Sequence, residues 1–219
     1  MQDENVDIKF FDLGDGMNFL TDVAKEIKHV EMKSDPIVIR INQFDEQTAR
    51  EFASAISKAQ GTGQPIVPVI IDSYGGEVYS LISMMSSIMN SKIPIATIVQ
   101  GKAMSCGAIL FAMGADGLRF VDPDSIIMIH EISGASWGKI EEIKANSKHL
   151  EFLNKTIYVK MAKHLGKQES FFLDKIHEFG HADWFLTATE AQEIGIANHI
   201  GLPVMKCKIN VEWAFGLSK

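Results

Sequence analysis

Predicted strands and helices alternate along most of this chain, and no other feature of the sequence limits its fold as strongly. Val67–Ile71 is a β-branched run that predicts a strand, a turn with two glycines follows at 73–76, and Val78–Met89 has the length of a helix. The remaining predicted elements continue this order, with strands at 37–41, 94–99 and 118–121 and helices at 45–59 and 105–113, and a further strand follows at 126–129. Alternation of this kind produces βαβ units and a mostly parallel sheet. We therefore predict an α/β fold.

One predicted helix, from Lys139 to Leu165, is much longer than the others. Its apolar residues recur at intervals of three and four, at Ile140, Ile143, Leu150, Leu153, Ile157, Met161 and Leu165. A helix of this length is a rod of roughly 42 Å. Because a single compact domain leaves part of such a rod uncovered, the apolar stripe indicates packing against another subunit.

The two ends of the chain are less regular than its body. Met17–Val30 has the spacing of an amphipathic helix, and Cys207–Trp213 can form an edge strand. Thr187–Glu190 has the form of a capping box and predicts a helix that runs to about Ile194. We divide the chain into a divergent acidic N-terminal segment (1–35), a body (36–201) and a C-terminal extension (202–219).

Composition excludes several classes of protein. Of the 219 residues 46% are hydrophobic, which is enough to form a core, and the net charge of −7 comes without a basic face for nucleic acid. Residues 1–60 hold 12 acidic and 7 basic side chains, so the acidic surplus is concentrated there. Two cysteines cannot form a disulfide framework, the N-terminus does not read as a secretory signal, and the apolar stretches are too short to span a bilayer. We expect a soluble, cytoplasmic protein that binds neither nucleic acid nor membrane.

Four positions offer chemistry, and each also has a plain structural interpretation. Ser105 lies between a predicted strand and a predicted helix, a setting that exposes a nucleophilic hydroxyl but also suits an N-cap. His130 ends a strand and can act as a general base, or it can simply be satisfied by the backbone. Asp183 can orient a histidine or cap a turn. Gly75 and Gly76 can bring backbone N–H groups to a ligand or make a tight turn.

Together these segments resemble the ClpP family, the proteolytic subunits of the Clp protease. The resemblance lies in Ile71–Gly76, Gly101–Ala108, Met128–His130 and Asp183–Ala188, in the order Ser, His, Asp, and in the 25 residues from Ser105 to His130. It covers roughly residues 36–201 and includes the long helix, at the place where that family has its ring-to-ring handle. The resemblance implies a ClpP/crotonase-like spiral of βαβ units with a long protruding handle helix.

The resemblance also implies a role for each catalytic position. Ser105 is expected as the nucleophile, His130 as general base and acid, and Asp183 as the carboxylate that orients the histidine. The backbone N–H groups of Gly76 and Cys106 match the oxyanion donors of the family.

Further expectations concern substrate and partners. The chain at Gly75 and Glu77, and the chain at Glu131 and Ile132 after the histidine, would flank an extended peptide. The subunits would form two stacked heptameric rings that receive unfolded proteins or peptides from a separate AAA+ unfoldase. No Walker or Rossmann motif occurs, so we expect no cofactor in this chain.

Several features depart from the family pattern. Tyr74, Cys106 and Glu131-Ile132 stand where proline, methionine and Gln-Pro are usual, and the chain between 168 and 181 is longer. The run His177–His181 fits the H-E-x-x-H spacing of zinc peptidases, but no third ligand is evident and we expect no metal site. The same fold also suits a crotonase-type acyl-CoA enzyme or a catalytically silent ring component.

Overall fold

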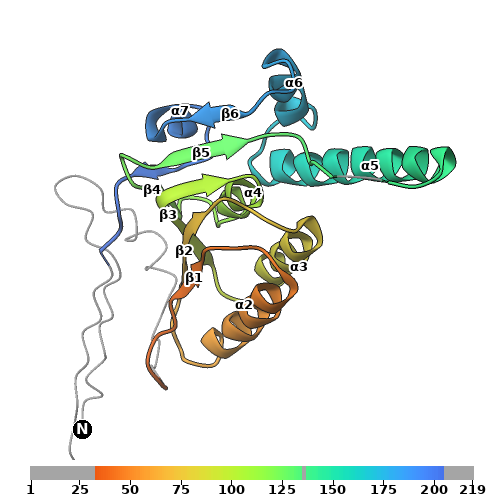
Figure 1. Ribbon diagram of the computed structural model, residues 1–219. Coiled ribbons are helices and arrows are strands. Elements are labelled where there is room, and N and C mark those ends of the chain that lie inside the picture. The colour runs from red at the N-terminus through yellow and green to blue at the C-terminus, as the bar shows by residue number, and fades with distance from the viewer. Residues whose placement is uncertain (1–32, 135–136, 205–219) are drawn as a thin grey trace, which may run out of the picture.

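The computed structural model describes residues 33–134 and 137–204, in which strands and helices alternate from residue 39 to residue 121 as the sequence predicts (Figure 1). The strands are β1 (Ile39–Ile41), β2 (Val67–Ser73), β3 (Ile95–Met104), β4 (Arg119–Val121), β5 (Ile126–Ile129), β6 (Trp184–Leu186) and β7 (His199–Ile200). The helices are α2 (Glu46–Ala59), α3 (Val78–Met89), α4 (Cys106–Ala112), α5 (Ile140–His164), α6 (Phe171–Glu178) and α7 (Ala188–Glu193). The predicted helix at 17–30 and the predicted edge strand at 207–213 lie outside the described residues.

The sheet is almost entirely parallel. Strands β1, β2, β3, β4 and β7 follow one another in this order, and β5 pairs with β3 on one side and with β6 on the other. Among the strands of the described residues, only the β5–β6 pair is antiparallel. The α/β class predicted from the alternating pattern is confirmed.

Strand β3 is longer than predicted because it pairs with two neighbours in succession. Residues 97–99 pair with β4, and residues 102–104 pair with β5. Gly101, whose φ is 105°, lies between the two paired segments. The apolar pattern predicts only the first half of the strand, because polar residues occur where β3 changes its pairing partner.

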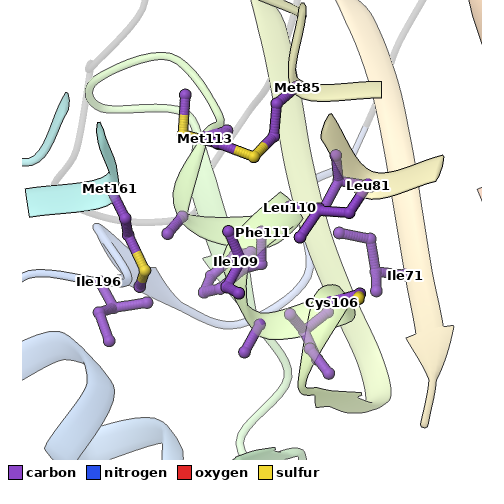
Figure 2. Close-up of a cluster of buried hydrophobic side chains, with 14 of the residues drawn as sticks. Ile71, Leu81, Met85, Cys106, Ile109, Leu110, Phe111, Met113, Met161 and Ile196 are labelled. Atoms are coloured by element: carbon purple, nitrogen blue, oxygen red, sulfur yellow. The ribbon is translucent and has the colours of Figure 1, made fainter. Parts of the chain in front are cut away.

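Helix α4 forms the centre of the core. All seven of its residues are buried, as expected of a helix that is apolar all round. Figure 2 shows Leu81 and Met85 of α3, Met161 of α5 and Ile196 around it. The chain that enters α4 is therefore held by a rigid, fully packed element.

Helix α5 is buried along only part of its length. Leu153, Ile157 and Met161 pack within this chain, whereas Ile140 and Ile143 are 71% and 38% exposed. Figure 1 shows the helix extending far beyond the sheet. The exposed members of the predicted stripe thus lie in the first turns of the helix, and Phe152, which is not part of that stripe, is also exposed. Within 33–134 and 137–204, no helix has the length and apolar character needed to cross a bilayer.

Candidate active site

Ser105 stands at the junction between β3 and α4 in an unusual backbone conformation. Its φ of 53° and ψ of −119° lie in a region that residues other than glycine rarely adopt. The amide of Ser105 donates to the carbonyl of Met128 at 2.8 Å, while its side chain makes no capping hydrogen bond to α4. Ser105 thus occupies the N-cap position of α4, but its hydroxyl does not cap the helix and remains available for another partner.

His130 follows the last residue of β5, and its imidazole contacts the serine. Its Nε2 atom lies 2.8 Å from Oγ of Ser105, within hydrogen-bond distance. The imidazole is thus engaged by a side chain rather than by the backbone.

Helix α5 fixes the chain at and after His130. The buried hydroxyl of Tyr158 donates to the carbonyl of His130, and Oδ1 of Asn154 accepts from the amide of Ile132 at 3.0 Å. Burial raises the pKa of the Tyr158 phenol, so this group remains protonated and available as a donor at neutral pH. The long helix therefore also positions the histidine.

Asp183 lies directly before β6, beside the histidine. The antiparallel pair Ile129–Trp184 is the last of the β5–β6 ladder, and the next position along each strand is His130 and Asp183. Oδ1 of Asp183 is 3.6 Å from Nδ1 of His130, which is an ion-pair contact longer than a hydrogen bond. The aspartate side chain is 52% exposed.

The topology of the sheet explains why these three residues meet. Strands β3 and β5 are parallel, so Ser105 and His130 leave the sheet at the same edge. Strand β6 runs in the opposite direction, so Asp183 enters the sheet at that edge. Neighbouring strands thus bring together residues that are far apart in the sequence.

The glycine pair passes directly beside the serine. Gly75 has a φ of 105°, and a Cβ atom built on it would lie 2.8 Å from Cβ of Ser105 and 3.3 Å from the amide nitrogen of Cys106. A Cβ on Gly76 would lie 2.4 Å from the carbonyl oxygen of Phe44. Both positions are therefore restricted to glycine by close approach as well as by the turn.

Cys106 joins the glycine pair to α4. Its thiol donates to the carbonyl of Gly76 at 3.3 Å, and burial raises the pKa of this thiol. Its amide belongs to the first residue of α4, where N–H groups lack partners within the helix. The side chain of Cys106 is packed into the core, so its backbone is the part available to a ligand.

A cavity of about 220 Å³ opens at this position. Of the predicted residues, those that line it are Gly76, Ser105, Cys106, His130 and Ile132. Glu77 lies instead at the N-terminus of α3, where its carboxylate accepts from Ser80. Glu131 is directed to another neighbour, with its carboxylate 3.1 Å from Nδ1 of His181.

Two tyrosines line the cavity although neither is among the predicted site residues. Tyr158 lines it and holds His130, and Tyr74 lines it from the segment before the glycine pair. The Lys102 ammonium lies 4.3 Å from the centre of the Tyr74 ring, and it also binds Asp72 at 2.6 Å. No local sequence pattern marks Tyr158, because its contact with His130 joins residues 28 positions apart.

The fold and the site define an α/β protein in which a serine, a histidine and an aspartate meet beside a backbone glycine pair. The chain belongs to the Clp protease family, whose sequence model matches residues 23–203. The ClpP resemblance drawn from the motifs is thereby confirmed, and the match begins before residue 36.

Individual relatives carry the same family name. The chain is 33% identical over 143 residues to ATP-dependent Clp protease proteolytic subunit 1 of Salinibacter ruber, which covers 65% of this chain and 59% of that protein. It is 29% identical over 168 residues to an ATP-dependent Clp protease proteolytic subunit of Bacteroides fragilis, which covers 76% of this chain and 79% of that one. The chain thus spans about three fifths of the length of the Salinibacter relative.

Proposed function

We propose that this chain is a subunit of a ClpP-type serine endopeptidase that hydrolyses peptide bonds through Ser105, His130 and Asp183. The observation that carries the proposal is the 2.8 Å contact between Ser105 Oγ and His130 Nε2. A nucleophile and a base within hydrogen-bond distance, with a third group beside the base, form the unit required for acyl transfer.

Each residue has a defined part in the reaction. His130 Nε2 takes the proton from Ser105 as Oγ attacks the peptide carbonyl, and it later gives that proton to the leaving amine. Asp183 orients the imidazole through Nδ1 and stabilises the imidazolium. Water then attacks the acyl-enzyme by the same base-assisted route and releases Ser105.

The negative charge on the tetrahedral intermediate needs hydrogen-bond donors that are already in place. We assign this role to the backbone N–H groups of Gly76 and Cys106. Both residues line the cavity that holds the serine, and the N-terminus of α4 adds a favourable dipole. The Cys106 side chain therefore matters less than the position of its backbone, whereas Gly76 has no room for a side chain.

The substrate is expected to be an extended peptide. Gly75–Glu77 and Glu131–Ile132 are the segments assigned to its two sides, and pairing with main-chain groups tolerates many sequences. Ile132 lines the cavity, and its amide is held by Asn154. The Glu131 carboxylate contacts His181 and does not line the cavity, so we place Glu131 at the rim of the peptide groove.

Assembly into stacked heptameric rings and delivery by a separate AAA+ unfoldase complete the proposal. The exposed apolar residues Ile140 and Ile143 at the projecting end of α5 support an interface between rings. The names of the relatives include ATP dependence, whereas this sequence carries no Walker motif, which supports a separate ATPase.

The Ser–His contact also separates this proposal from an acyl-CoA enzyme and from a silent ring component. Crotonase-type chemistry does not require a serine nucleophile, and a silent ring component has no need to keep all three residues together. The proposal is tested with Ser105→Ala, which is expected to abolish peptide hydrolysis and to keep the native mass of the assembly. Ser83→Ala, an exposed serine of α3, is the matched control and should retain wild-type activity. Hydrolysis by assembled Ser105→Ala would contradict the mechanism.

A further inference from the structure

A second cluster of reactive side chains lies beyond the His130–Asp183 pair. Glu131, His177 and His181 place one possible ligand atom each within 4.8 Å of the others. The Glu131 carboxylate is 3.1 Å from Nδ1 of His181 and 4.0 Å from Nε2 of His177. The two imidazole rings have their centres 4.6 Å apart. Three donors from two separate segments of the chain thus converge on one point.

The backbone brings the two histidines together by a sharp turn rather than by a helix. Helix α6 ends at Glu178, and Gly180 and His181 both have positive φ, at 64° and 62°. The amide of His181 donates to the carbonyl of Ile176 at 3.0 Å and closes this turn. A left-handed conformation is uncommon for residues other than glycine, and here it returns the ring of His181 to the side of His177.

This geometry differs from that of a zinc peptidase. In the H-E-x-x-H motif both histidines lie on one helical face, and the glutamate serves as the base. Here His181 lies beyond the helix, and Glu178 is paired with Lys175 at 2.7 Å. The third donor is Glu131, which the sequence pattern could not supply because it follows a different strand.

The donor set matches a particular class of metal. Two imidazole nitrogens and one carboxylate oxygen are ligands that Zn²⁺ accepts, at about 2.0–2.2 Å in a tetrahedral arrangement. Donor atoms around such an ion stand roughly 3.3 Å apart, from the same bond lengths. The Glu131–His181 pair, at 3.1 Å, is close to this separation, whereas Nε2 of His177 is 4.0 Å from the carboxylate and this exposed side chain has to move closer to serve as the third donor.

We propose that Glu131, His177 and His181 form a Zn²⁺ site with a fourth position open to water. Glu131 directly follows His130, and His181 precedes Asp183 by two residues. The ion would therefore tie together the two segments that carry the histidine and aspartate of the candidate triad. This inference concerns metal binding and goes beyond the proposed peptidase activity.

The test is calorimetric titration of the full-length, metal-free chain with Zn²⁺. We expect one ion per chain. Each of the variants Glu131→Gln, His177→Gln and His181→Gln should raise the dissociation constant for Zn²⁺ by about tenfold or more. The matched control is His149→Gln, an exposed histidine of α5 that stacks beside Tyr79 and is not part of the cluster. It should bind Zn²⁺ as the wild type does.

A second measurement keeps the result independent of how the variants fold. Co²⁺ bound to the wild-type chain is expected to give the intense visible absorption of tetrahedral coordination, and Zn²⁺ should displace it. Absence of saturable binding, absence of this absorption, or undiminished affinity in all three variants would overturn the proposal. Ser105→Ala should bind Zn²⁺ as tightly as the wild type, so the outcome does not depend on peptidase activity.

Discussion

The contact between Tyr158 and His130 gives the sharpest prediction about how the fold supports the candidate site. Replacing Tyr158 with phenylalanine removes one hydroxyl and leaves the ring, which packs against Phe172 in the core. The carbonyl of His130 then loses the donor that α5 supplies. The substitution creates almost no cavity, so its effect reports the hydrogen bond itself.

The magnitude follows from burial. An acceptor left without its donor costs about 1–3 kcal/mol when it is fully buried, and because the Tyr158–His130 bond is only partly buried, we expect a loss near the lower end, about 1 kcal/mol. Loss of the Tyr158 hydroxyl also allows the backbone at His130 to move. In the proposed mechanism the Nε2 atom of His130 has to stay near its distance of 2.8 Å from Oγ of Ser105. Because a displacement of about 1 Å can cost on the order of 100-fold in rate, we expect kcat to fall by about 10- to 100-fold. KM should change little, since the aromatic ring remains in the cavity wall.

The assay compares peptide hydrolysis and urea unfolding of Tyr158→Phe with those of Tyr79→Phe. The Tyr79 hydroxyl also has a partner in α5, His149, but Tyr79 is 63% exposed and does not line the cavity that holds His130. The control should leave kcat and the free energy of unfolding nearly unchanged. A folded Tyr158→Phe variant that loses stability but retains wild-type kcat would refute the positioning role.

Three further predictions test the carboxylate of the candidate triad, a helix cap and the projecting helix. Asp183→Asn should lower kcat by about 10²- to 10⁴-fold with little change in KM, because an amide cannot stabilise the imidazolium; wild-type kcat in steady-state hydrolysis would remove Asp183 from the mechanism. The hydrogen bond from the Thr48 amide holds the pKa of the Asp45 carboxyl below its ordinary value of 3.8. The cap therefore stabilises the folded chain fully at pH values above 3.8, and this stabilisation is lost as the pH falls through the lowered pKa of the folded state. Urea unfolding should accordingly show a larger loss of stability for Asp45→Ala at pH 7 than at pH 2, and an equal loss at both would be inconsistent with the cap. Ile143→Glu should reduce the native mass of the assembly, whereas Ala145→Glu on the opposite face of α5 should leave it unchanged; unaltered mass in both would place the interface elsewhere.

Local patterns predicted most of the fold. Helix α3 and strand β5 begin and end at the predicted residues, and Thr187 and Glu190 form the predicted capping box. These elements follow from apolar periodicity and capping, which depend on residues close together in the sequence. The predicted strand at 94–99 is shorter than β3, because the second half of β3 is formed by pairing with β5 and contains polar residues that the apolar pattern does not include.

The candidate site was predictable in its parts but not in its geometry. The order of the motifs indicates Ser105, His130 and Asp183 as candidate site residues. The strained backbone of Ser105 and the 3.6 Å separation between His130 and Asp183 cannot be predicted in this way, because they depend on how neighbouring strands pair. Tyr158 and the neighbours of Glu131 were missed for the same reason. Their contacts join residues that no local pattern relates.

The proposed mechanism is tested most directly by labelling the assembled, full-length chain with a serine-directed fluorophosphonate and mapping the adduct by mass spectrometry. The mechanism predicts one adduct per chain, located on Ser105, with peptide hydrolysis lost in proportion to labelling. Ser105→Ala should take up no label, and Ser83→Ala should be labelled as the wild type is. An assembled chain that hydrolyses peptides while Ser105 stays unmodified, or that is inactivated by an adduct on another residue, would contradict it.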